Sequence, residues 1–221
     1  MNDTELVSNA IDYLNKNKKE FIAQFTDEIQ PEQNKVVIFT AGMSGVGKTE
    51  FAQFLKEQNP NLLHIDTDEI REFFRPIGYN GQNSNTFQKP ASKGFSKLFD
   101  YAVKKGFSII LDSNLSNISK AVENIDRLIN KGYTIELYYL YNDPAVCYEY
   151  AIKREVVTNR KVPYDIFVKS NIDSFHTVIS IKQQYNGKIT LNYLDKRDDT
   201  LYKDIDSDTL IEKLGGYFDT K

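Results

Sequence analysis

The chain has 221 residues, of which 40% are hydrophobic and 27% are charged, a composition that excludes a disordered or fibrous protein. Its net charge of −3 argues against nucleic acid or an anionic membrane surface as the main partner. Cys147 is the only cysteine, which excludes an intramolecular disulfide and a thiolate zinc cluster. The N-terminus is polar, and no apolar run reaches the length of a membrane span, so we expect a cytoplasmic protein without a membrane partner.

An apolar stripe near the N-terminus predicts one amphipathic helix over residues 4–29, ending before Pro31. The stripe consists of Val7, Ile11, Leu14, Phe21, Phe25 and Ile29. We predict that this segment, within residues 1–34, packs on a single domain that spans residues 1–221.

Five short apolar runs predict buried strands, because strands covered on both faces are apolar throughout. They occupy residues 36–41, 62–66, 107–112, 133–141 and 189–194. Helical patterns separate the runs: one follows Lys48, two span residues 90–105 and 119–131, and one opens at Asp143-Pro144. This alternation predicts an α/β fold with a doubly wound, mostly parallel five-stranded sheet.

A phosphate-binding motif follows the first predicted strand. The segment Gly42-Met43-Ser44-Gly45-Val46-Gly47-Lys48-Thr49 matches G-x-x-x-x-G-K-[ST] in full, between a strand and a helix. Such loops surround phosphates with backbone N–H groups, while the lysine reaches the β- and γ-phosphates and the hydroxyl binds Mg²⁺. The loop alone allows a motor, a GTPase or a small kinase. The chain lacks the N-K-x-D motif that reads guanine in GTPases, and motors usually need a larger chain or a ring of subunits, so we predict a P-loop kinase type of fold with ATP and Mg²⁺ as cofactors.

Acidic residues end the second and third strands. Asp66 and Asp68 follow the second strand, where one carboxylate can serve as general base and the other, Asp66, as a metal ligand. A helix-capping role is the alternative for either residue. Asp112 ends the third strand, where it can hold a metal-bound water or a substrate hydroxyl, or serve only as a turn residue.

Arginines after the fourth strand suit the oxygens of a transferring phosphoryl group. Arg154 lies on the predicted helix and Arg160 follows it in the segment 158–163. A solvated helix face with an Arg154–Glu155 pair is the alternative for Arg154.

Three further features have a structural interpretation. The polar loop 78–89 is predicted to be a plain surface loop. His64 is predicted to be a buried core histidine, and the tyrosines of the fourth strand, Tyr138, Tyr139 and Tyr141, to pack in the sheet.

Taken in order, these features resemble the zeta toxin family from about residue 10 to about residue 194. The shared set comprises the N-terminal helix, the strand and loop around 36–49, Ile65-Asp66-Thr67-Asp68, the apolar strand that ends in Asp112, Lys131-Gly132-Tyr133, and an arginine followed by an R-x-x-P segment at 160–163.

The resemblance implies a P-loop phosphotransferase of a toxin–antitoxin system. Zeta toxins use ATP and Mg²⁺ to phosphorylate the 3′-hydroxyl of the amino sugar in UDP-N-acetylglucosamine, and an antitoxin protein is their partner. The family's catalytic base falls on Asp68, and its phosphate-facing arginines fall on Arg154 and Arg160. Its sugar ligands fall on Asp112, Ser113 and Asn114, and an acid that touches substrate falls at or near Ser96. The region of loop 78–89 walls the substrate site in the family.

Two departures concern the acceptor. Asn114 stands where the family has a threonine, and Ser96 stands where it has a glutamate. Phosphoryl transfer from ATP is therefore better supported than UDP-N-acetylglucosamine as the acceptor. The alternatives are a P-loop kinase of a nucleic-acid end, a cofactor or an antibiotic, and a nucleotide-binding interaction protein without catalysis of its own.

Overall fold

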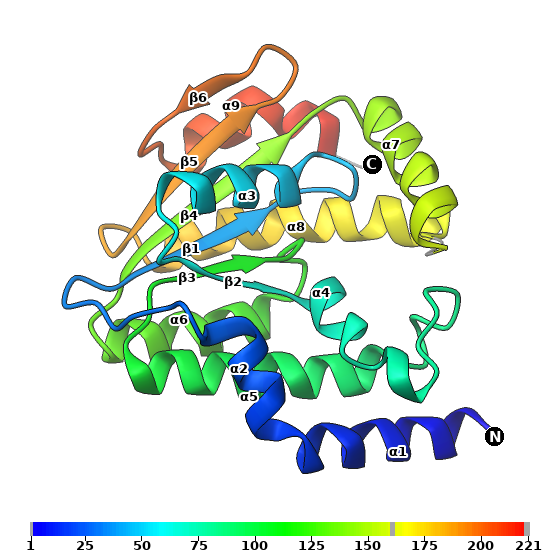
Figure 1. The fold of residues 1–221 in the computed structure, drawn as a ribbon. Coiled ribbons are helices and arrows are strands. Elements are labelled where there is room, and N and C mark those ends of the chain that lie inside the picture. The colour runs from blue at the N-terminus through cyan, green and yellow to red at the C-terminus, as the bar shows by residue number, and fades with distance from the viewer. Residues whose placement is uncertain (1, 160–161, 219–221) are drawn as a thin grey trace.

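The computed structural model describes residues 2–159 and 162–218. Its centre is a six-stranded sheet in the order β2-β3-β1-β4-β5-β6 (Figure 1). The strands are β1 (Val36–Ala41), β2 (Leu63–Asp66), β3 (Ile109–Asp112), β4 (Thr134–Tyr141), β5 (Ile189–Asp195) and β6 (Thr200–Tyr202). Strands β1 to β5 are parallel, and β6 is antiparallel to β5. The mostly parallel α/β fold is confirmed, with β6 as an additional edge strand.

The N-terminal segment forms two helices, so the prediction of one helix over residues 4–29 is wrong. Helix α1 (Asp3–Lys16) ends at Asn17, and α2 (Lys18–Thr26) begins directly after it. The side-chain amide of Asn17 donates a hydrogen bond to the carbonyl of Tyr13 at 2.9 Å. Short polar side chains that bond to the nearby backbone in this way compete with helix continuation.

The other helices connect the strands or follow the sheet. They are α3 (Lys48–Gln58), α4 (Thr67–Glu72), the 3₁₀ turn η1 (Arg75–Ile77), α5 (Gln88–Lys105), α6 (Ile118–Asn130), α7 (Pro144–Thr158), α8 (Tyr164–Gln184) and α9 (Ser207–Phe218). In the part of the chain that the structure describes, none of these helices has both the length and the apolar character needed to cross a membrane.

Alternate residues of the central strand face two different cores, because side chains of a strand alternate between its faces. Ile38 packs with Ala52 of α3 on one face of the sheet. Val37 and Phe39 face the larger core, to which α5, α6 and α8 contribute (Figure 1). Both faces of β1 are therefore covered, as the unbroken apolar run predicts.

Close packing at Gly94 of α5 fixes the short helix α4 relative to the N-terminal segment. A Cβ at Gly94 would lie 2.7 Å from Cγ2 of Ile70 and 3.2 Å from Cζ of Phe21. The Phe21 ring also packs against Phe73, with the centroids 5.0 Å apart. Helix α2 thus supports α4 from outside the sheet, while the boundary of the N-terminal segment at residue 34 stays a prediction.

The tyrosines of β4 pack in the sheet as predicted. Tyr139 and Tyr141 are fully buried. Tyr138 points to the other face, where its ring lies 5.0 Å from the ring of Phe51 in α3. They serve the core rather than a ligand site.

Candidate active site

The loop between β1 and α3 has the backbone geometry of a phosphate-binding loop. Gly42, Gly45 and Gly47 have φ angles of 129°, 80° and 95°, which side chains disfavour. A Cβ at Gly45 would lie 2.1 Å from the carbonyl oxygen of Cys147, and one at Gly42 would lie 2.3 Å from that of Leu140. The loop therefore fits against the end of β4 and the start of α7 only because these positions are glycine.

The variant Gly45→Ala tests this fit, with Gly78→Ala as its control. Gly78 also has a positive φ, but a Cβ placed there would meet no atom of the described residues within 4 Å. We expect Gly78→Ala to lower the free energy of unfolding by about 1–2 kcal/mol, the cost of the left-handed backbone alone. Gly45→Ala should lower it further and weaken ATP binding, because the loop must move away from Cys147. Chemical denaturation and nucleotide titration measure both, and equal unfolding effects at the two sites would contradict the steric argument.

Lys48 lies folded over the loop that precedes it. Its Nζ donates hydrogen bonds to the carbonyls of Gly42 at 3.0 Å and Met43 at 2.7 Å. Burial lowers the pKa of Lys48 to about 8, and the positive charge of Arg154 acts in the same direction, against the opposing charge of Asp112. A desolvated ammonium group beside a glycine-rich loop at a helix N-terminus favours an anionic ligand such as a phosphate.

Thr49 is paired with the acid that ends β3. Its hydroxyl donates to Oδ2 of Asp112 at 2.9 Å, and the hydroxyl of Thr40 donates to Oδ1 at 2.9 Å. Burial alone would raise the pKa of Asp112, but the neighbouring His64, the charge of Lys48 and the hydrogen bond from Thr40 hold it below its usual value. A P-loop hydroxyl beside an ionised strand-end aspartate is the pair that holds Mg²⁺ in P-loop enzymes.

Asp66 lies beside Asp112, since the two residues are register partners on adjacent strands. Burial raises the pKa of Asp66 to about 7, and the charges of Asp68 and Asp112 act in the same direction. A divalent cation would relieve this repulsion, and hydroxyl and carboxylate oxygens are the donors that Mg²⁺ prefers. The residues present therefore fit Mg²⁺.

The protein side chains alone do not form a complete metal cage. Within residues 2–159 and 162–218, no three His, Cys, Asp or Glu side chains are placed to hold one metal ion together. This agrees with Mg²⁺ sites in which phosphates and waters supply most of the ligands. The assignment of Thr49 and Asp66 as metal ligands stays a prediction.

Asp66, rather than Asp68, caps helix α4. Oδ1 of Asp66 accepts a hydrogen bond from the backbone N–H of Asp68 at 2.9 Å. The carboxylate of Asp68 instead binds the guanidinium of Arg71, which is buried and also binds Oε1 of Gln88 at the start of α5. The side chain of Asp68 is thus held at the carboxyl edge of the sheet by Arg71, and Gln88 holds Arg71 in turn. Sequence reasoning missed both residues.

His64 is buried, as predicted, but it lies between two acids. Its Nδ1 is 3.3 Å from Oε1 of Glu69, and its Nε2 is 3.6 Å from Oδ2 of Asp112. Burial disfavours the imidazolium, yet the two carboxylates outweigh burial and raise the pKa of His64 to about 9. His64 therefore belongs to the polar network beneath the loop.

The residues predicted to contact the acceptor are only partly brought together. Ser113 and Asn114 directly follow Asp112, and their side chains accept hydrogen bonds within their own turn, from Leu115 and Ser116. Ser96 is exposed on α5, and its hydroxyl donates to the carbonyl of Ser92 at 3.0 Å. Ser96 lies eight residues beyond Gln88, which is about 12 Å along a helix, so Gln88 rather than Ser96 is the residue of α5 that reaches the Asp68–Arg71 pair.

Helix α7 carries Arg154 toward the loop. Arg154 is half-buried, and its charge is near enough to lower the pKa of Lys48. Arg160 lies outside the described residues. The end of α7 touches the loop 78–87, because a Cβ at Gly81 would lie 2.2 Å from the carbonyl oxygen of Thr158. The polar loop and the arginine helix therefore meet at the same edge of the sheet.

The sequence model of the zeta toxin family matches residues 19–207, which include the loop, the acids and α7. The chain belongs to the zeta toxin family. No curated protein sequence matches the chain.

Solved structures share the zeta toxin fold at low sequence identity. The toxin–antitoxin system PezAT of Streptococcus pneumoniae contains a chain with a TM-score of 0.73 and 16% identity, and the alignment covers 91% of this chain and 86% of that one. The complex AvrRxo1-ORF1:-ORF2 with ATP gives a TM-score of 0.65 at 12% identity, covering 96% and 70%. A putative kinase from Chloroflexus aurantiacus gives 0.54 at 16%, covering 84% and 96%.

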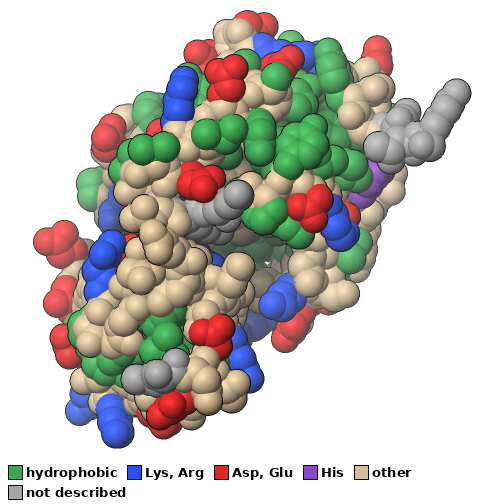
Figure 2. Space-filling view, turned by 90° about the vertical axis from the view of Figure 1, so that its right-hand side faces the viewer, with side chains coloured by type: hydrophobic (Ala, Val, Ile, Leu, Met, Phe, Trp, Pro, Cys, Tyr) green, Lys and Arg blue, Asp and Glu red, His purple; other side chains and the backbone are tan. Residues whose placement is uncertain are grey.

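The candidate site lies at the carboxyl edge of the sheet, which faces the viewer in Figure 2. The surface is hollowed near its centre, with acidic and basic side chains around the hollow and hydrophobic side chains gathered above it. Ligands of open parallel sheets bind at this edge.

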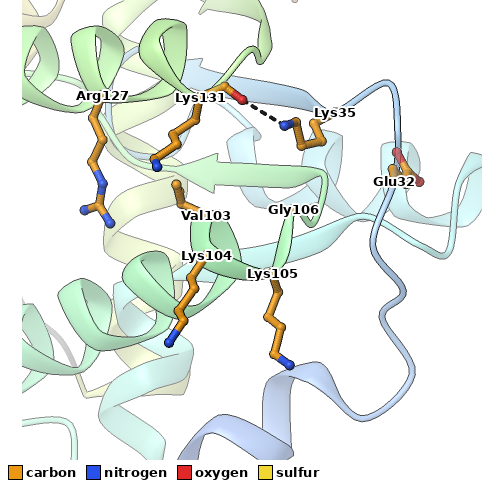
Figure 3. A pocket seen from close by; sticks show the side chains of 8 residues that line it. All are labelled: Glu32, Lys35, Val103, Lys104, Lys105, Gly106, Arg127 and Lys131. Carbon is orange, nitrogen blue, oxygen red and sulfur yellow. Dashed lines mark hydrogen bonds between the residues drawn. The ribbon is translucent and has the colours of Figure 1, made fainter.

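A cavity of about 470 Å³ lies at the opposite, amino edge of the sheet (Figure 3). Its lining residues are Glu32, Lys35, Val103, Lys104, Lys105, Gly106, Arg127 and Lys131. Lys104 and Lys105 lie in the last turn of α5, and Nζ of Lys35 donates to the carbonyl of Lys131 at the end of α6 at 2.8 Å. Cations at the ends of two helices compensate the negative ends of the helix dipoles, so these residues are explained without a ligand.

Proposed function

We propose that the protein is an ATP-dependent phosphotransferase that transfers the γ-phosphoryl group to a hydroxyl of a small molecule. The observation that carries the proposal is the hydrogen bond between Thr49 of the phosphate loop and Asp112. Asp66 lies beside Asp112 at the same sheet edge, and the charge of Asp68 is near enough to raise the pKa of Asp66. A nucleotide-binding interaction protein needs the loop alone, whereas phosphoryl transfer also needs a base on the acceptor side.

The donor side would hold ATP and Mg²⁺. Backbone N–H groups within the loop 42–49 and the ammonium of Lys48 would bind the β- and γ-phosphates, while Thr49, Asp112 and Asp66 would provide oxygen ligands for the metal. Asp112, which the resemblance assigns to the sugar, therefore lies on the donor side in this proposal. When bound, Mg²⁺ neutralises the charge that develops on the phosphates. Arg154 contributes a further positive charge to the transferring group.

The acceptor side would be built around Asp68. The bond between the γ-phosphorus and the bridging oxygen to ADP breaks, a bond to the acceptor oxygen forms, and the hydroxyl proton passes to the Asp68 carboxylate. Arg71 and Gln88 orient that carboxylate. Ser113, Asn114 and the loop 78–87 are the groups that face the acceptor in this proposal.

UDP-N-acetylglucosamine, or a related nucleotide sugar, is the acceptor we propose, because the chain belongs to the zeta toxin family. Asn114 stands where the family has a threonine, and Gln88 rather than Ser96 is the residue of α5 near Asp68, so the proposed acceptor pocket departs from that of the characterised toxins. Mass spectrometry of reactions with ATP, Mg²⁺ and a panel of nucleotide sugars, cofactors, antibiotics and nucleic-acid ends tests the assignment. Product with another acceptor would replace the sugar, and ATP binding without any product would favour the interaction protein.

Arg154→Ala is expected to lower kcat much more than it raises the KM for ATP. An arginine that acts on the transition-state charge contributes differentially between ground state and transition state. Lys153→Ala is the matched control, because Lys153 is exposed on the same helix and its Nζ lies over the Tyr150 ring. Steady-state kinetics of both variants decide the role, and unchanged turnover in Arg154→Ala would assign Arg154 to the helix surface.

An antitoxin protein is the partner that we propose, and cytoplasm is the proposed location. The support is the family membership and the likeness to chains from a toxin–antitoxin system and from a two-protein complex. Size-exclusion chromatography of the chain co-expressed with candidate antitoxins tests the partnership.

A further inference from the structure

We propose that His64 is a positioning residue that holds the Asp112 carboxylate in the orientation in which it accepts the Thr49 hydroxyl. The inference rests on the proposed use of Thr49 and Asp112 to bind magnesium nucleotide. It adds a residue that lies two positions before the end of β2 and does not belong to the phosphate loop.

The two hydrogen bonds that Asp112 accepts leave the β2 side of its carboxylate without a partner from Thr40 or Thr49. Thr49 and Thr40 each donate one hydrogen bond, to different oxygens of the carboxylate. Thr40 belongs to β1, and Thr49 is itself a proposed metal ligand. Neither contact approaches Asp112 from the side of β2, where His64 lies in register beside Ile110 of β3.

His64 fills that side. It is buried, and its Nε2 lies 3.6 Å from Oδ2 of Asp112, the same oxygen that accepts the Thr49 hydroxyl. Among the described residues, Nε2 makes no hydrogen bond of normal length to any other group. A buried polar nitrogen without a closer partner is costly, so its placement against this oxygen indicates a specific electrostatic contact.

The second nitrogen links the same ring to helix α4. Nδ1 lies 3.3 Å from Oε1 of Glu69, the residue after Asp68. The ring is therefore fixed at both nitrogens, between the strand-end acid on the donor side and the first turn of the helix that carries the proposed base. Such outer partners commonly fix the orientation of metal-binding carboxylates.

Substitution of His64 by glutamine or by asparagine tests the contacts of its two ring nitrogens separately. The amide nitrogen of glutamine can replace Nε2 and that of asparagine can replace Nδ1, so His64→Gln keeps a donor toward Asp112 and His64→Asn keeps one toward Glu69. The quantity to measure is the ratio of the ATP dissociation constants in EDTA and in Mg²⁺, obtained by calorimetric titration. Loss of an outer partner typically weakens metal binding by about tenfold to a hundredfold.

We expect His64→Asn to reduce this ratio about tenfold or more, with the affinity for ATP in EDTA nearly unchanged. His64→Gln should recover most of the ratio. In an Asp112→Asn background, His64→Asn should change the ratio no further. An unchanged ratio in His64→Asn, or equal losses in the two variants, would overturn the assignment.

Thermal unfolding of each variant checks folding, and His64→Met, which also lacks the donor, replaces His64→Asn if the latter does not fold. The measurement is independent of the acceptor. If the wild-type protein transfers no phosphoryl group to any acceptor, the proposed function is contradicted, but the ratios of the ATP dissociation constants still test the role of His64. If those ratios do not differ between the wild type and the His64 variants, the role of His64 is contradicted, but the proposed function is not.

Discussion

Asp68→Asn is expected to bind ATP nearly as well as the wild type and to lose almost all phosphoryl transfer. Asparagine keeps the size of the side chain and an oxygen for the guanidinium of Arg71, but it cannot accept the proton of the acceptor hydroxyl. Loss of a general base costs about a hundredfold to ten-thousandfold in turnover. Nucleotide titration and quantification of the phosphorylated product by mass spectrometry measure the two effects separately.

The structure excludes a helix-capping role for the side chain of Asp68, which was the main alternative to its role as a base. Helix α4 is capped by Asp66, whose carboxylate accepts the N–H of Asp68, so a change at Asp68 does not remove the cap. Glu72→Gln is the control, because Glu72 is exposed on the same helix and pairs only with Arg75 among the contacts of described residues. Wild-type turnover in Asp68→Asn would show that another group takes the proton.

The fold could be predicted from the sequence where local patterns and packing agree. The five parallel strands are continuous apolar runs because helices cover both faces of the sheet. Strand β6 has only three residues, all at least partly exposed, so it leaves no such run. The break at Asn17 was missed because Leu14 and Phe21, seven residues apart, are both buried, and the apolar stripe continues although the helix does not.

The site could be predicted where its residues are contiguous. Lys48 and Thr49 belong to one motif whose loop geometry depends on its own glycines. The contact between Thr49 and Asp112 depends on β3 lying next to β1, which no local pattern reveals. Arg71 was detectable in principle, since residues three apart on a helix meet, whereas Gln88 reaches Arg71 only through the packing of α4 on α5.

The roles of Gln88 and His64 therefore had no signal in the sequence. His64 looks like a core residue because the strand around it is apolar. Its two partners lie on other elements, Glu69 on α4 and Asp112 at the end of β3. Residues that orient a catalytic group through tertiary contacts need no fixed spacing from it along the chain, so no sequence motif marks them.

Lys48→Ala is expected to lose productive ATP binding while the fold is retained. The ammonium group neutralises the β- and γ-phosphates, and loss of one such charge-stabilising group typically lowers turnover by about a hundredfold to a thousandfold. The loop should keep its shape, since the N–H of Gly42 is held by Oγ of Ser174 at 3.1 Å and its glycines fit against β4 and α7. Lys56→Ala, an exposed position on the same helix, is the matched control.

Nucleotide titration, steady-state turnover and thermal unfolding of both lysine variants check this expectation. A folded Lys48→Ala protein with wild-type affinity and turnover would show that the phosphates bind elsewhere. The comparison with Asp68→Asn separates the two halves of the site: Lys48→Ala should impair nucleotide binding and transfer together, whereas Asp68→Asn should impair transfer alone. Equal losses of binding in both variants would mean that Asp68 acts on the nucleotide rather than on the acceptor, because a base on the acceptor side has no reason to change the affinity for ATP.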